Sequence, residues 1–158
     1  RRQPVNNDKF AEDCLRERQT MQKPGASPIT TQLERENKSK HSLSNSHYFL
    51  EGAKQILSGS TPYLAFPLGF FAMEHAANAL IALKGYSITD HKCAQIFFSK
   101  LLNREDLAKA LSRAYNARIA FNYRNNLNDY RDKTEAEEFL QNEVIPFIEE
   151  IKKLLKGA

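Results

Sequence analysis

The sequence contains few cysteines, and they follow no pattern of a ligand set or redox motif. Cys14 and Cys93 are the two cysteines in 158 residues, without a CxxC and without the cysteine–histidine spacing of a zinc site. Thiols placed in this way are typical of reduced cysteines in the cytosol, so we expect free thiols and a cytoplasmic protein. The first residue is not Met, which leaves open that the sequence is a piece of a longer polypeptide.

Membrane and secretion signals are missing as well. We find no apolar run that we judge long enough to span a bilayer, and no apolar region follows the basic start Arg1-Arg2. We therefore expect no membrane partner.

Strand signals, nucleotide-binding glycine loops and metal motifs are also lacking. No segment alternates between apolar and polar residues for long, so a sheet is not expected. Glu74-His75 and Asp90-His91 are adjacent pairs, unlike the Glu-x-x-His pairs of a di-metal bundle, so we expect no metal and no cofactor. His91 is expected near a helix start, in a structural or solvated role.

The composition suits a soluble globular domain with an appendage. Hydrophobic residues make up 41% of the chain and charged residues 27%. The net charge of +4 permits an RNA partner without requiring one, and much of the positive excess lies in the first 40 residues.

Apolar residues recur at three- and four-residue steps over most of the chain, which predicts helices. The predicted helices cover about residues 44–58, 62–84, 87–100, 103–123 and 134–156. The second is apolar almost all round and is expected to be the central, most buried helix, while Pro146 is expected to bend the last one. The predicted fold class is all-α, an antiparallel bundle of four to five helices over residues 44–158. Residues 1–43 are expected to form a weakly structured N-terminal extension or linker, in which residues 8–22 have the pattern of a short helix.

A polar cluster near the end of the fourth predicted helix is the first candidate site. Arg118 and Asn122 share a helix face, with Tyr123 at its edge. A guanidinium suits phosphate oxygens and a tyrosine supplies a stacking ring, so the cluster is either a site for RNA or a partner protein, or a network that pins two helices together. The polar residues that begin at Arg124 favour the first interpretation.

Glu74 and His75 interrupt the most apolar predicted helix. They form either an exposed edge or the polar floor of a groove, in which Glu74 would meet a cation such as Arg118. The catalytic candidates are Arg118, Asn122, Tyr123 and His75. Asn122 does not titrate and Tyr123 is a poor base at neutral pH, so His75 would serve only if the fold brings it close.

Four motifs in order resemble the HEPN superfamily. They are Phe70-Phe71-Ala72-Met73-Glu74-His75-Ala76-Ala77-Asn78-Ala79-Leu80-Ile81, then Lys84-Gly85, then Asp90-His91-Lys92, and then Arg118-x-x-x-Asn122-Tyr123 before a final amphipathic helix. The chain is most similar to the branch with a YYAxFHA-like second helix and an R-x-x-x-D-Y ending, and the similarity covers about residues 46–156.

The resemblance implies an all-α bundle that commonly forms a two-fold dimer, with the motif helices meeting in a cleft. HEPN proteins include metal-independent ribonucleases, toxins of toxin–antitoxin pairs, partners of a minimal nucleotidyltransferase, and RNA-binding or interaction modules. The active ribonucleases carry a histidine four to six residues after the arginine, whereas no histidine follows Arg118 here. Phe70-Phe71 replaces the tyrosine pair, Glu74 replaces an aromatic residue, and Asn122 replaces the acidic residue.

The resemblance therefore favours a HEPN-like module that binds RNA or a partner protein in a toxin–antitoxin or defence context. Its binding residues would be Arg118, Asn122, Tyr123, Arg124 and Glu74, and its partners a second copy of the chain, RNA or a nucleotidyltransferase-type protein. The alternatives are a metal-independent ribonuclease and an oligomerisation domain of a larger polypeptide.

Overall fold

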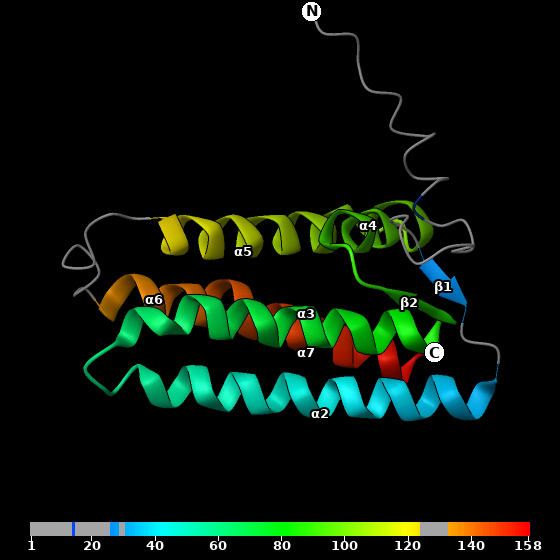
Figure 1. Ribbon diagram of the computed structural model, residues 1–158, viewed down its shortest axis with the longest axis horizontal. Coiled ribbons are helices and arrows are strands. Elements are labelled where there is room, and N and C mark those ends of the chain that lie inside the picture. Colours follow the sequence, from blue (N-terminus) through cyan, green and yellow to red (C-terminus); the bar gives the residue numbers. More distant parts are fainter. Residues whose placement is uncertain (1–13, 15–25, 29–30, 124–132) are drawn as a thin grey trace, which may run out of the picture.

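The computed structural model describes residues 14, 26–28, 31–123 and 133–158 (Figure 1). The possible helix at residues 8–22 lies outside them, apart from Cys14. In chain order the elements are β1 (Ala26–Pro28), α2 (Gln32–Ile56), the 3₁₀ turn η1 (Pro62–Leu64), α3 (Ala65–Leu83), β2 (Tyr86–Ile88), α4 (His91–Ile96), the π-helical turn η2 (Phe97–Leu101), α5 (Glu105–Tyr123), α6 (Lys133–Phe139), the π-helical turn η4 (Leu140–Val144) and α7 (Ile145–Lys156). The predicted all-α class is confirmed.

Helix α3 forms the centre of the bundle. It lies between α2 on one side and α5 on the other, and it also packs against α7 (Figure 1). Eleven of its residues are buried, which confirms the expectation that the segment 62–84 is the most buried helix. Pro67 falls in its first turn, where the missing N–H donor costs little.

By length and composition alone, Pro62–Leu83 is apolar enough to cross a membrane, so the expectation that no run is long enough was wrong. The core helix of a soluble protein can have the same length and composition, and 56% of the apolar 18-residue stretch within this segment is buried inside the structure.

Helix α2 begins at Gln32, well before the predicted start near Ser44. The side chain of Thr31 caps it by accepting a hydrogen bond from the Glu34 N–H, at 3.2 Å. The buried face of the helix consists of Ser39, Ser42, Ser46, Leu50 and Ala53. Three of these are serines, so a search for apolar residues does not detect the first half of the helix. The small side chains allow α2 to approach α3 closely, and the Ser46 hydroxyl donates to the Ala72 carbonyl oxygen at 2.7 Å.

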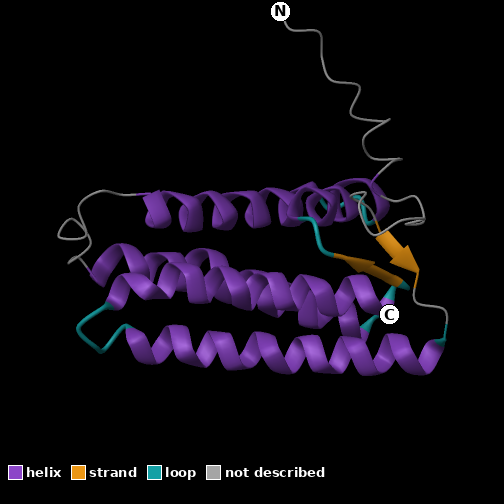
Figure 2. Ribbon diagram, viewed as in Figure 1, coloured by secondary structure: helices purple, strands orange, loops and turns teal. Residues whose placement is uncertain are grey.

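A small sheet is present, although none was expected. Strand β1 pairs antiparallel with β2, with Ala26 opposite Ile88 and Pro28 opposite Tyr86 (Figure 2). Each strand has three residues, too few to show an alternating pattern, and the two lie far apart in the sequence.

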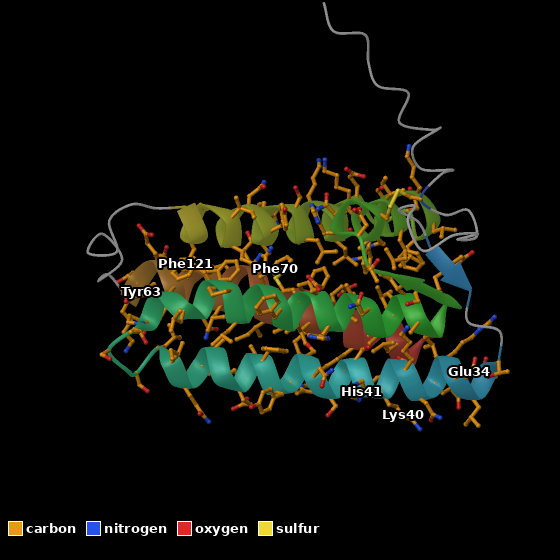
Figure 3. The ribbon with its side chains drawn as sticks, viewed as in Figure 1. Glu34, Lys40, His41, Tyr63, Phe70 and Phe121 are labelled. Carbon is orange, nitrogen blue, oxygen red and sulfur yellow. A yellow bond between two sulfur atoms is a disulfide. The ribbon has the colours of Figure 1, made fainter. Side chains whose placement is uncertain are left out.

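The two cysteines form a disulfide, so the expectation of free thiols was wrong. Cys14 and Cys93 are bonded across a sequence separation of 79 residues, and the bond lies beside α4 (Figure 3). Both residues are buried. A pairing over such a distance depends on the tertiary fold and leaves no local signature in the sequence.

The remaining helices deviate from the prediction mainly at their ends. Helix α4 starts at His91, a few residues after the predicted start near residue 87, because Asp90 is its N-cap, with its carboxylate accepting from the Cys93 N–H at 2.9 Å. The last predicted helix contains the π-helical turn η4 directly before Pro146, whose ring nitrogen has no hydrogen to donate.

Candidate functional site

Arg118 extends from α5 onto a group of aromatic rings. Its guanidinium carbon lies 5.0 Å from the ring centroid of Phe70 and 5.6 Å from that of Phe71, both on α3. The ring of Tyr115, about one turn earlier on α5, is 5.7 Å away. These distances are within the range of about 6 Å in which a cation is attracted to the face of an aromatic ring. Figure 3 shows Phe70 between α3 and α5.

The polar atoms of Arg118 have few partners. Its Nε atom is buried without a hydrogen bond, and within the part of the chain that the structure describes, no carboxylate forms an ion pair with its guanidinium. A buried donor without an acceptor costs about 1–3 kcal/mol, more for a charged group. The aromatic rings hold this guanidinium in place without supplying an acceptor for its buried Nε donor.

Glu74 lies on the same side of α3 as Phe70, one turn further along the helix. Burial raises the pKa of its carboxyl group, and the nearby positive charge of Arg118 lowers it by less. The structure therefore brings Arg118 and Glu74 close enough to interact electrostatically, although they are not in ion-pair contact.

A cleft between α3, α4 and α5 continues from these residues. Its lining includes Phe70, Glu74, Asn78, His91, Gln95 and Tyr115. The enclosed volume is about 20 Å³, room for about one water molecule, so a larger ligand would bind at the mouth of the cleft. We call these six residues together with Arg118 the Arg118 cleft.

His91, at the start of α4 as expected, also lines this cleft. Its imidazole stacks on the Tyr115 ring, with the centroids 3.8 Å apart and the planes at 16°. Tyr115 therefore contacts both the imidazole of His91 and the guanidinium of Arg118. Tyr115 was not predicted as a site residue, and His91 was not connected with Arg118, because only the packing of α4 on α5 brings the two rings together.

His75 is not brought to Arg118. Its imidazole stacks on Phe49 of α2, 5.2 Å between centroids and 7° between planes. Burial lowers the pKa of His75, and the nearby His41 lowers it further. His75 thus belongs to the α2 side of α3, whereas Arg118 lies on α5.

The other predicted site residues lie at the end of α5. Asn122 and Tyr123 are in its last turn, and the structure does not describe their side chains. Arg124 lies outside the described residues.

A broad groove between α4, η2 and α5 adjoins the Arg118 cleft and shares Gln95 with it. Its volume is about 550 Å³, and its charged lining residues are Lys92, Lys100, Lys109 and Glu105. The positive charges exceed the negative one, so the groove attracts polyanions. We call it the lysine groove.

Among the described residues, no group of three or more histidine, cysteine, aspartate or glutamate side chains is positioned to hold a metal ion. Comparisons of the chain with protein-family models, curated proteins and solved structures find no match. The function is therefore argued from the site itself.

Proposed function

We propose that the chain is a HEPN-like helical module that binds RNA or a partner protein through the Arg118 cleft, with single-stranded RNA as the ligand that the geometry favours. The observation that carries the proposal is the guanidinium of Arg118, held by three aromatic rings with its Nε donor unpaired. A guanidinium fork matches phosphate oxygens, and partly exposed rings such as Phe71 and Tyr115 can stack with unpaired bases.

The lysine groove supports RNA over a compact anion. Lys92 comes from the first turn of α4 and Lys109 from α5, so positive charge continues from the cleft along two elements. Proteins that bind single strands combine such a groove for the backbone with aromatic side chains on which bases stack.

The proposal is tested by measuring the binding of a labelled single-stranded RNA at several salt concentrations. We expect Arg118→Ala to weaken binding and to reduce the slope of log K against log salt by about one, as for the loss of one phosphate contact. Arg113→Ala is the matched control. Arg113 is also on α5, but it is already paired with Glu143 through two hydrogen bonds of 3.0 and 2.9 Å.

Thermal unfolding separates recognition from a structural role. If Arg118→Ala binds RNA as the unaltered protein does, or loses binding only in proportion to its loss of folded protein, the cleft is not the RNA site. Equal losses in Arg113→Ala and Arg118→Ala would also contradict the proposal, because they would report net charge alone.

A metal-independent ribonuclease is the second candidate, and the position of His91 favours it. His91 and Glu74 are two titratable groups that line one cleft beside the phosphate-binding candidate Arg118. RNA cleavage needs a group that removes a proton from the 2′-hydroxyl and a group that protonates the leaving oxygen. Incubation of labelled RNA with the protein in EDTA tests this candidate. Cleavage that is lost in both His91→Ala and Arg118→Ala would select it over binding alone.

The resemblance to HEPN proteins supplies the rest of the proposal: a homodimer, a nucleotidyltransferase-type partner, a toxin–antitoxin or defence setting, and a cytoplasmic location. Light scattering of the purified protein tests the dimer. The Cys14–Cys93 disulfide argues against the cytoplasmic part of this proposal, since disulfides persist in oxidising compartments and are rare in the cytosol.

A further inference from the structure

A second groove lies between α2, α3 and β2, on the α2 side of α3. Its volume is about 330 Å³. Buried residues that line it include Ser42, Ile81 and Ile88. The polar lining residues are Lys38, His41, Asn45, His75, Asn78, Ser87 and Thr89. We call it the histidine groove, and the proposed function does not use it.

Lys38 spans the groove from α2 to β2. Its Nζ atom donates to the Ser87 hydroxyl oxygen at 2.7 Å, which fixes the ammonium group between the two elements. An ammonium group has three N–H donors, and this contact uses one. The remaining donors are available to a ligand in the groove.

Two imidazoles lie in the same groove. The Nε2 atom of His41 is 3.4 Å from the Nδ2 atom of Asn45, and the ring of His75 is fixed by stacking on Phe49. The titratable groups that line the groove with His75 are His41 and Lys38 from α2 and Tyr86 from β2. Within the described residues, none of the lining groups is a carboxylate. Protonation of either histidine therefore adds positive charge to a groove that has no acidic counterpart.

The donor set fits an anion better than a metal ion. A tightly bound zinc or copper ion needs three or four protein ligands, and the groove offers two imidazoles without a thiolate or carboxylate among the described residues. The ammonium group of Lys38 would also repel a cation. An anion, in contrast, would accept hydrogen bonds from Lys38 and from protonated histidines, and charge-assisted bonds of this kind are the stronger ones.

We propose that the histidine groove binds the phosphate group of a small molecule through Lys38, His41 and His75. A volume of about 330 Å³ is within the range of small-molecule sites, so the groove has room for more than inorganic phosphate. The amides of Asn45 and Asn78 and the hydroxyl of Thr89 are donors and acceptors for the rest of the ligand.

The proposal predicts that binding is tighter in mildly acidic than in alkaline solution. Burial and His41 lower the pKa of His75, so the empty groove holds this histidine mainly neutral near neutral pH. A bound phosphate favours the protonated ring and raises that pKa, which links binding to proton uptake.

The test is a titration of the histidine side-chain NMR signals at about pH 6.5, the ordinary histidine pKa, and again at about pH 8. Inorganic phosphate, adenosine monophosphate and adenosine are the probes. We expect both phosphate compounds to shift the His41 and His75 signals, more strongly at the lower pH, and adenosine to leave them unchanged. Tighter binding of adenosine monophosphate than of inorganic phosphate would assign the groove to a phosphate monoester; equal binding would assign it to the free anion.

Two matched pairs of variants locate the site on α2. Lys38→Met and His41→Gln remove donors from the groove and should weaken binding about tenfold or more, as for loss of a hydrogen bond to a charged group. Lys40→Met and His47→Gln remove the same groups from exposed positions of α2 that do not line the groove and should bind normally. Figure 3 labels Lys40 and His41 on this helix. Equal binding of adenosine, unchanged His41 and His75 signals, or equal losses in both members of a pair would each overturn the proposal.

Discussion

At the scale of single residues, Glu74 is a partly buried carboxylate that is not in ion-pair contact with Arg118. Burial raises the pKa of its carboxyl group more than Arg118 lowers it. The folded protein therefore holds a proton on Glu74 more tightly than the unfolded chain does. The contribution of this proton to the free energy of unfolding is fully present below the pKa that Glu74 has in the unfolded chain. It is lost as the pH rises through the pKa that Glu74 has in the folded protein.

Replacement of Glu74 by glutamine should reverse this loss. Glu74→Gln removes the partly buried negative charge while keeping the shape, so we expect a higher melting temperature than that of the unaltered protein at pH 7.5. The difference should disappear at about pH 4, near the ordinary glutamate pKa. Glu138→Gln, at an exposed position of α6, is the control. It should change the free energy of unfolding by no more than about 0.5 kcal/mol at either pH. A Glu74→Gln protein that is less stable at pH 7.5 would mean that attraction to Arg118 outweighs the burial of the carboxylate.

The residues of the Arg118 cleft show how much of a site a sequence reveals. Arg118 and Glu74 were predicted because polar residues stand out in an apolar helical pattern. His91 and Tyr115 come together only when α4 packs on α5, and their ring contact has no counterpart in spacing along the chain. His75 follows Glu74 directly, yet the helix turns it toward Phe49 of α2, so within one chain the fold does not bring it close to Arg118, as its catalytic role would have required.

At the scale of elements, the close approach of α3 to the C-terminal helices depends on Gly69. A Cβ atom added there would lie 2.9 Å from both Phe139 Cε1 and Val144 Cγ2. Those side chains are buried and cannot move without disturbing α6 and η4.

Gly69→Ala should therefore destabilise the protein in spite of the higher helix propensity of alanine. Overpacking costs about 1–3 kcal/mol and the propensity gain is about 1 kcal/mol, so a net loss of up to about 2 kcal/mol is expected. Gly52→Ala on α2 is the matched change, because its added Cβ would meet only Leu68 Cδ1, at 3.9 Å. Chemical denaturation of both variants measures the difference, and a Gly69→Ala protein as stable as Gly52→Ala would show that α3 does not pack this closely on η4.

Most helices were predictable because apolar periodicity and helix caps depend on residues that are close together in the sequence. The exceptions have identifiable causes. Helix α2 extends back to Gln32 with serines on its buried face, and serine does not count as apolar in a periodicity search. The pairing of β1 with β2 joins the segment before α2 to the segment after α3, so the sequence carries no hairpin signal for it.

At the scale of the whole molecule, the disulfide fixes Cys14 to Cys93 in the first turn of α4. It closes a loop with a sequence separation of 79 residues, and a bond of this kind typically stabilises a protein by about 2–4 kcal/mol through the unfolded chain. The bond links Cys14, which precedes β1 in the chain, directly to α4.

Loss of the bond should lower the free energy of unfolding by about that amount, about 2–4 kcal/mol. The comparison is between the unaltered protein and the double variant Cys14→Ala, Cys93→Ala in chemical denaturation. A reducing agent should destabilise the first and leave the second unchanged. Thiol titration of the denatured, unreduced protein should find no free thiols; two titrating thiols would contradict the bond.

The hairpin of α2 and α3 has a consequence for the order in which the molecule folds. The two helices are separated by residues 57–61 and the turn η1, so their contacts close a short loop at little entropic cost. Proteins dominated by such local contacts fold quickly, whereas pairings between distant segments are slow. The serine face of α2 can therefore meet α3 early, and the β1–β2 ladder, which joins Ala26 to Ile88 across this whole hairpin, closes late. We therefore expect the chain to assemble from its central helix outward, with the groove beside β2 completed in the final steps.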